Sequence, residues 1–112
     1  GILATDGTLA AETYQLACQE QGIGWAAPSE EHQQEVMSVI YDDIKQGKRA
    51  DMAKFGAAVH DLKKQGCDMA VLGCTELSLV KRDEHLGLFF IDSTEVLCRH
   101  ALEACGVKPI GF

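Results

Sequence analysis

The sequence predicts a single α/β domain, in which helices cover both faces of a mainly parallel sheet in three layers. Short apolar runs alternate with longer segments that carry apolar residues at helical spacing, the order expected for strands joined by helices. The run at residues 67–73 is apolar apart from Asp68, which is typical of a parallel strand covered on both faces. A chain of 112 residues suits one modest core, so we expect residues 1–112 to form one domain.

The first quarter of the chain predicts a strand, a helix and a second extended segment. Residues 1–5 are apolar, and the turn pair Asp6-Gly7 follows them. A helix is then expected up to Gly22, which stands where a helix C-cap belongs. Four of its residues recur at helical spacing: Leu9, Thr13, Leu16 and Ala17. Residues 23–28 are expected to be extended and to end at Pro28.

The middle of the chain predicts two amphipathic helices. The first begins at Ser29, a favourable N-cap with acidic residues after it, and stops at Gly47. The second covers residues 51–65 and stops at Gly66. Their apolar faces are formed by Val36, Val39, Ile40 and Ile44, and by Met52, Phe55, Val59 and Leu62.

The last third predicts two buried strands and a final helix. The strands are expected at residues 67–73 and 88–92. Asp92, with Glu95 three residues later, resembles a capping box that opens a helix over residues 93–105, which Gly106 ends.

Composition excludes several classes of function. Ten Lys and Arg against 17 Asp and Glu give a net charge of −7, which repels nucleic acid and anionic membranes. No apolar run approaches the roughly 20 residues that cross a bilayer. The four histidines are scattered without ligand spacing to the thiols, so no metal site is predicted. Five cysteines, an odd number without a CxxC pair, fit a reducing cytoplasm.

Cys74 is the candidate for chemistry. It follows the strand at residues 67–73 and precedes a helix, and ligands of open α/β sheets bind beyond the carboxyl ends of the strands. A helix N-terminus favours a thiolate, so we expect a lowered pKa for Cys74. Gly73 allows close backbone approach, and the amides of Thr75 and Glu76 would point toward a bound carboxylate. The alternative is that Cys74 is a small buried residue, as free cysteines commonly are.

The other cysteines are expected to pack. Cys98 and Cys105 lie seven residues apart on the side of Leu102, and Cys18 has apolar neighbours, so these three are predicted to be in the core. Cys67 begins the strand whose other end bears Cys74, roughly 20 Å away, so it is no partner for that thiol.

Four segments together resemble the second half of the aspartate/glutamate racemase family. They are LATDGT at residues 3–8, IYDDIKQG at 40–47, GCTEL at 73–77 and IDST at 91–94, in the family's order. The resemblance implies a cofactor-independent racemase of two similar lobes. One cysteine from each lobe would face opposite sides of the substrate's α-carbon, one thiolate removing the proton while the other thiol delivers one.

The resemblance also implies roles for single residues. Cys74 matches the second-lobe cysteine. Lys45 resembles the lysine for the substrate's side-chain carboxylate, although a solvated helix-end lysine is also favoured there. Thr75 would hold the α-carboxylate or simply cap the helix. Glu76 replaces a histidine of glutamate racemases, which favours aspartate or a broader acidic specificity that includes glutamate; capping of the helix start is the alternative role for Glu76. Thr5 and Thr8 would face the same crevice, with packing or capping as the alternative for Thr8.

The resemblance implies a first lobe outside this chain, on which residues from about 92 onward would pack. The exposed apolar surface of a lone lobe then predicts a homo-oligomer. Two alternatives stay open: a lobe that binds ligand or oligomerises without catalysis, and a relative of hydantoin racemases or arylmalonate decarboxylases.

Overall fold

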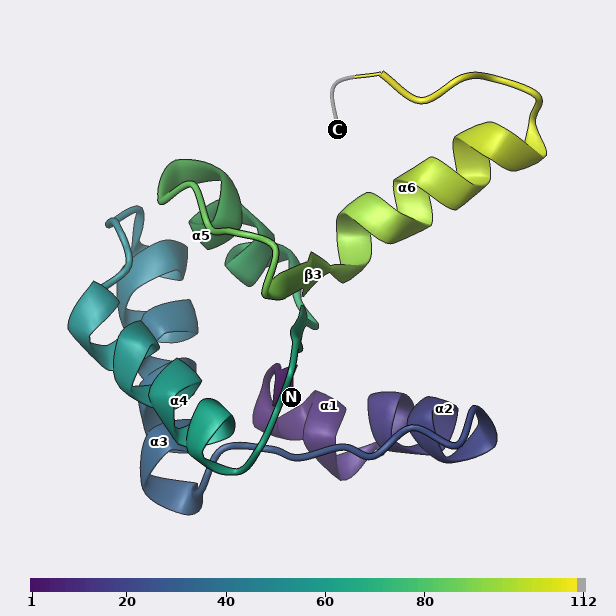
Figure 1. The fold of residues 1–112 in the computed structure, drawn as a ribbon. Coiled ribbons are helices and arrows are strands. Elements are labelled where there is room, and N and C mark those ends of the chain that lie inside the picture. The colour runs from purple at the N-terminus through teal and green to yellow at the C-terminus, as the bar shows by residue number, and fades with distance from the viewer. Residues whose placement is uncertain (111–112) are drawn as a thin grey trace.

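The computed structural model describes residues 1–110 and shows a mixed α/β fold, which confirms the predicted class (Figure 1). In these residues the strands β1 (Ile2–Leu3), β2 (Ala70–Leu72) and β3 (Phe90–Asp92) form a parallel sheet in the order β1-β2-β3. Ile2 pairs with Val71, and Val71 pairs with Ile91. All strands are short, and their carboxyl ends lie at one edge of the sheet.

Helices account for most of the remaining described chain. The α-helices are α1 (Asp6–Ala10), α2 (Thr13–Glu20), α3 (Glu30–Ser38), α4 (Met52–Lys64), α5 (Thr75–Asp83) and α6 (Ser93–Ala104). A π-helical turn η1 (Val39–Asp43) and a 3-10 turn η2 (Ile44–Gln46) continue α3. Gly22, Gly47, Gly66 and Gly106 all have positive φ, as expected where glycines end helices. Within residues 1–110, no helix has the length and apolar character needed to cross a membrane.

The hydrophobic core lies on one face of the sheet. The predicted stripes of α3 and α4 meet there, and α5 adds Leu77 and Val80. Phe55 of α4 lies against Phe90 of β3, with ring centroids 5.7 Å apart. The buried residues of the hydrophobic core are Leu3, Val36, Val39, Ile40, Phe55, Ala58, Val59, Leu62, Ala70, Leu72, Leu77 and Val80.

The first helix was predicted to be continuous up to Gly22, but the structure divides it into α1 and α2. Glu12 has a φ of 56°, a left-handed conformation that separates α1 from α2. Leu16 and Ala17 of α2 are exposed, while Gln15 is buried. Gln15 donates a hydrogen bond from Nε2 to the carbonyl of Leu9, whereas its buried Oε1 accepts no hydrogen bond from the described residues.

Two other local expectations also differ from the structure. Residues 23–28 form no strand, and their link to the sheet is one hydrogen bond of 2.9 Å from the amide of Ile2 to the carbonyl of Ala26. Pro28 has no amide to donate, which limits further pairing at that end. Ser29 precedes α3 as predicted, but its side chain makes no capping bond, and its amide instead donates to Asp61.

Helix α6 stands apart from the core, although Cys98 and Cys105 were predicted to be buried. Both thiols are exposed, and no residue of α6 is buried. Figure 1 shows α6 and α2 extending from the body toward the same side, with the sheet between their bases. The spacing correctly indicates an apolar face on α6, but nothing in residues 1–110 covers that face.

Candidate active site

Cys74 lies at the carboxyl end of β2 and is the N-cap residue of α5. The strand places it at the edge of the sheet where β1 also ends, because the two strands run parallel. Its side chain is partly buried and packs against the rim of the core. The structure therefore confirms the predicted placement of this thiol between a strand and a helix.

Gly73 lets the backbone before Cys74 approach its neighbours closely. Its amide donates to the carbonyl of Leu3 at 2.8 Å. A Cβ at this position would lie 2.9 Å from Cε2 of Tyr14 and 3.0 Å from Cβ of Ala4. A side chain here would displace the Tyr14 ring and press against Ala4, so glycine permits this close approach of the backbone before Cys74.

The predicted lowering of the Cys74 pKa is wrong. Burial raises the pKa of the Cys74 thiol, and the Glu76 carboxylate raises it further. The backbone amides of Leu77 and Glu76 at the helix start lower the pKa of Cys74, but burial outweighs them. A thiol with a raised pKa is mostly protonated at neutral pH.

Lys45 and Glu76 form an ion pair beside Cys74. The distance between Lys45 Nζ and Glu76 Oε1 is 2.9 Å, and the lysine also lies over the ring of Tyr41. Glu76 raises the pKa of Lys45, mainly through this hydrogen bond, and Lys45 in turn lowers the pKa of Glu76. Lys45 is thus neither a free substrate cation nor a simply solvated lysine.

The short turns after α3 explain how Lys45 reaches this position. A π-helical turn widens the helix at Val39–Asp43, and a 3-10 turn then tightens it through Lys45. Such departures from α-helical winding change the direction of the residues that follow. Sequence periodicity predicted a regular helix here and contained no signal for the change.

The three predicted threonines have local partners. Thr75 donates from Oγ1 to Glu76 Oε2 at 3.2 Å. Thr5 is the N-cap of α1, where its Oγ1 accepts from the amide of Thr8, and the two hydroxyls lie 3.1 Å apart. The side chain that caps α1 is therefore that of Thr5, and Thr8 supplies the capped amide. Thr5 lies beyond the end of β1, at the same sheet edge as Cys74.

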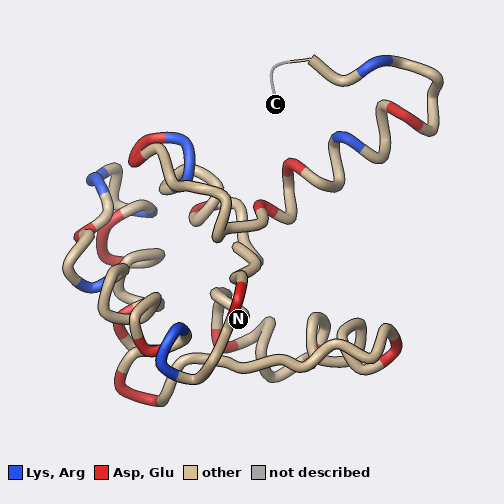
Figure 2. Tube along the Cα trace, in the orientation of Figure 1, with Lys and Arg blue, Asp and Glu red and all other residues tan. Residues whose placement is uncertain are grey.

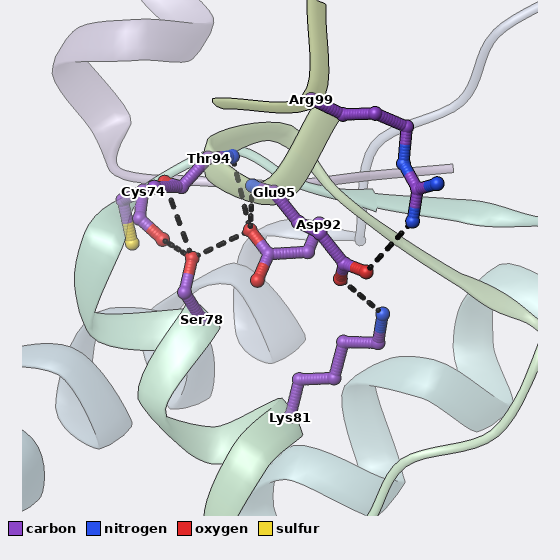
Figure 3. Close-up of polar contacts among 7 residues, drawn as sticks. All are labelled: Cys74, Ser78, Lys81, Asp92, Thr94, Glu95 and Arg99. Carbon is purple, nitrogen blue, oxygen red and sulfur yellow. Dashed lines mark hydrogen bonds and ion pairs between the residues drawn. The ribbon is translucent and has the colours of Figure 1, made fainter. Parts of the chain in front are cut away.

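A polar cluster that the sequence did not reveal links the Cys74 helix to α6 (Figure 3). Ser78, one turn after Cys74, lies 2.7 Å from Asp92 Oδ1 and 3.4 Å from the Cys74 carbonyl. Asp92 is 9% exposed, and the same oxygen accepts from the amides of Thr94 and Glu95. A serine on a predicted helix is an ordinary surface residue, so only the folded chain identifies this contact.

Only one of the two hydrogen-bonding roles of the expected capping box is seen at α6, the one in which Asp92 accepts from backbone amides. Asp92 caps the helix as predicted. The Glu95 carboxylate accepts from Lys81 Nζ at 2.9 Å and lies 3.8 Å from Arg99 (Figure 3). Glu95 therefore ties α6 to α5 by an ion pair.

The structure brings four of the predicted site residues together at one edge of the sheet. Cys74, Thr75 and Glu76 are consecutive, and Lys45 comes from a distant part of the chain. The arrangement combines a group that can exchange a proton with one positive and one negative charge. Such a set is suited to proton transfer on a small zwitterionic or polar substrate.

Comparison with known proteins identifies the family of the chain. Residues 1–101 match the family described as Asp/Glu/Hydantoin racemase. A protein of Pectobacterium carotovorum subsp. carotovorum, described as an uncharacterized protein in the pnlA 3′ region, is 33% identical over 106 residues. The alignment covers 92% of this chain and 70% of that relative. The chain therefore belongs to the Asp/Glu/hydantoin racemase family.

Proposed function

We propose that this chain contributes Cys74 to the racemisation of an acidic amino acid, aspartate in particular. The observation that carries the proposal is a single thiol at the carboxyl edge of a parallel sheet, flanked by the Lys45–Glu76 pair. Membership of a racemase family supports the reaction class. The choice of aspartate and the role of the thiol go beyond that membership.

The reaction proceeds by two proton transfers at the α-carbon. A thiolate on one face takes the α-proton and becomes a thiol, while the electron pair of the C–H bond remains as a carbanion delocalised into the carboxyl group. A thiol on the opposite face donates its proton and becomes a thiolate. Because burial raises the pKa of Cys74, its resting role is that of donor.

The second proton-transfer group comes from outside residues 1–110. Cys18 lies on α2, Cys67 precedes the amino end of β2, and Cys98 and Cys105 lie on α6. These four positions are away from the carboxyl edge that bears Cys74. In the two-lobed racemases that this chain resembles, the other lobe supplies the opposite cysteine.

The charged pair matches the two charged ends of an amino acid dicarboxylate. A substrate carboxylate would displace Glu76 from Lys45 and take over its positive charge. The released Glu76 carboxylate would then face the substrate ammonium group. In a chain with a net charge of −7, this local cation offsets the general repulsion of an acidic substrate.

One observation favours a hydantoin as the second candidate substrate. The positive charge of Lys45 is already compensated by Glu76 at 2.9 Å, so a neutral substrate needs no displacement of that pair. The family description includes hydantoin racemases. Comparing turnover of D-aspartate with turnover of a chiral hydantoin by the same preparation decides between the two substrates.

The experiment is the substitution Cys74→Ser, with Cys67→Ser as the matched control at a cysteine that packs against the core. Exchange of the substrate α-proton in D₂O is followed by NMR, together with optical rotation. We expect Cys74→Ser to lower the rate by about 10²–10⁴-fold, the usual contribution of an acid–base group, while Cys67→Ser keeps most of it. Unchanged exchange in a folded Cys74→Ser protein would refute the role of Cys74.

A further inference from the structure

Residues 91–94 contribute no side chain to the proposed proton transfer, yet they lie next to the backbone that carries Cys74. Three of them are polar, and they stand where β3 ends and α6 begins. β3 runs beside β2, and Asp92 pairs with Leu72, two residues before Cys74. The side chains of this segment are therefore placed to reach the backbone on which the thiol is mounted.

The backbone just before Cys74 is held from both neighbouring strands. Ser93 donates from Oγ to the Leu72 carbonyl at 2.7 Å. On the other side, the Gly73 amide donates to the Leu3 carbonyl at 2.8 Å. Because both bonds lie at the carboxyl end of β2, this end has little freedom to shift between its neighbours.

Ser78 holds the backbone on the other side of Cys74, in the first turn of α5. Its amide donates to the Cys74 carbonyl at 3.3 Å, and its hydroxyl lies 2.7 Å from Asp92 Oδ1. A hydroxyl has one proton to donate, and the short distance to a carboxylate assigns that proton to Asp92. The contacts of the same hydroxyl with the Cys74 carbonyl and Thr94 Oγ1 are longer, at 3.4 and 3.3 Å. Figure 3 shows the hydroxyl between Cys74 and Asp92.

The start of α5 depends on this anchor because its N-cap supplies none. The Cys74 side chain makes no capping hydrogen bond, and helix ends without side-chain partners fray. Asp92 is 9% exposed, and its Oδ1 also accepts from the amides of Thr94 and Glu95. A carboxylate held by three donors is a fixed point, so Ser78 ties the turn that begins at Cys74 to the end of β3.

A second contact between α5 and α6 lies about two turns along α5 from the thiol. Lys81 Nζ and Glu95 Oε2 are 2.9 Å apart, and their side chains are 25% and 29% exposed. Figure 2 shows acidic and basic residues on both helices. Salt screens partly exposed ion pairs, whereas the bond from Ser78 ends on a buried carboxylate. The two contacts can therefore be separated by substitution.

From these contacts we infer that three side chains position the Cys74 thiol: Ser78, Asp92 and Ser93. They hold the backbone before and after the thiol at the carboxyl edge of the sheet, and they act through Cys74 and not on the substrate. The catalytic consequence rests on the proposed function. A proton-transfer group must lie within hydrogen-bond reach of the proton that it moves, and a misplacement of about 1 Å can lower a rate by about 10²-fold.

Alkylation of Cys74 by iodoacetamide tests the positioning without any need for racemase activity. Peptide mass spectrometry compares the rate at Cys74 with the rate at Cys67 in the same protein, because both thiols are partly buried and a general loosening would expose both. Ser78→Ala frees the turn, which exposes the thiol and weakens the burial that raises its pKa. We expect the ratio of the Cys74 rate to the Cys67 rate to rise at least about threefold.

Further variants identify which contact matters. Ser93→Ala, before the thiol, should raise the ratio in the same direction, and Ser78→Thr, which keeps a hydroxyl, should retain the wild-type ratio. Ser38→Ala is the matched control, because it removes a helix serine that also donates to a carboxylate, Asp42 Oδ2 at 2.9 Å. Lys81→Gln breaks the ion pair between α5 and α6. Both controls should leave the ratio unchanged, and circular dichroism confirms that each variant is folded.

Two results of the alkylation experiment would overturn the positioning role. The first is an unchanged ratio in a folded Ser78→Ala protein. The second is an equal rise in Lys81→Gln, because the general attachment of α6 to α5, and not the bond from Ser78, would then set the place of the thiol.

Racemisation assays test the catalytic consequence. Ser78→Ala should lower kcat by about 10-fold to 10²-fold and leave KM nearly unchanged, because the Lys45–Glu76 pair is not altered. Ser38→Ala should keep the wild-type kcat. A raised alkylation ratio with an unchanged kcat would overturn the catalytic part of the inference. A wild-type protein without racemase activity would count against the proposed function alone, since the alkylation ratio does not depend on turnover.

Discussion

The protonation of Cys74 depends on two opposing influences within one turn of helix. Burial and the Glu76 carboxylate raise the pKa of the thiol, while the amides of Glu76 and Leu77 lower it. Glu76 has a double effect, because it also neutralises Lys45, whose charge would otherwise favour the thiolate. One carboxylate therefore sets both the charge and the proton affinity of this edge of the sheet.

Substituting Glu76 tests this balance. Glu76→Gln removes the negative charge next to Cys74 and frees Lys45, and both changes favour the thiolate. We expect the pKa of Cys74 to fall, so that its alkylation by iodoacetamide, followed by peptide mass spectrometry, begins at a lower pH than in the wild type.

The control for this prediction is Glu84→Gln. Glu84 follows the far end of α5 and pairs with Arg49. Its substitution should leave the pH dependence of Cys74 alkylation unchanged. A Glu76→Gln protein whose Cys74 reacts only at the same or a higher pH would contradict the assigned role of Glu76.

At the scale of elements, α6 is held by its first turn. Asp92 accepts hydrogen bonds from Ser78 and from two amides of α6. Ser78 lies one turn after Cys74, so the same cluster connects the start of α5 to the start of α6 (Figure 3). The stability of this junction depends on polar contacts, because α6 contributes no buried residue.

Asp92→Ala should therefore cost more than the loss of an ordinary helix cap. The cap itself contributes about 1 kcal/mol, and leaving the Ser78 hydroxyl without its partner adds a cost of similar size, for a total of about 2 kcal/mol. The free energy of unfolding in urea measures the effect.

Two variants serve as references for Asp92→Ala. Asp51→Ala removes the N-cap of α4, whose capping bonds are exposed, and should cost about 1 kcal/mol. Asp92→Asn keeps an acceptor oxygen and should lose less than Asp92→Ala. Equal losses for Asp92→Ala and Asp51→Ala would show that the link to Ser78 contributes no stability.

At the scale of the whole molecule, the core is one-sided. The buried cluster lies between the sheet and α3, α4 and α5, while the opposite face carries an apolar trough lined by α2 and residues 65–69. Apolar side chains of similar chemistry therefore differ greatly in their contribution to the free energy of unfolding, depending on which face of the sheet they occupy.

Two substitutions measure this difference at a protein concentration low enough to exclude association. Phe55→Ala opens a cavity among buried residues and should lower the free energy of unfolding by about 3–5 kcal/mol. Leu97→Ala changes an exposed position and should stay within about 0.5 kcal/mol of the wild type. A large loss for Leu97→Ala in the monomer would mean that α6 packs on its own chain.

Local sequence signals determined most of the elements that form and where the candidate thiol lies. The spacing of Val36, Val39 and Ile40 predicted a buried stripe, and glycines marked the helix ends. These signals are reliable because caps, stops and periodicity act over a few neighbouring residues. The position of Cys74, between a strand and a helix, follows from the same kind of signal.

Only the tertiary structure decided what each apolar face and each charge meets. The spacing on α6 could not show that Cys98 and Cys105 face solvent, and the left-handed Glu12 interrupts the helix that was expected up to Gly22. The helix start favours a Cys74 thiolate, yet burial by distant elements outweighs it. Burial, ion pairing and pKa depend on residues far apart in the chain, so the pairing of Lys45 with Glu76 became visible only in the folded molecule.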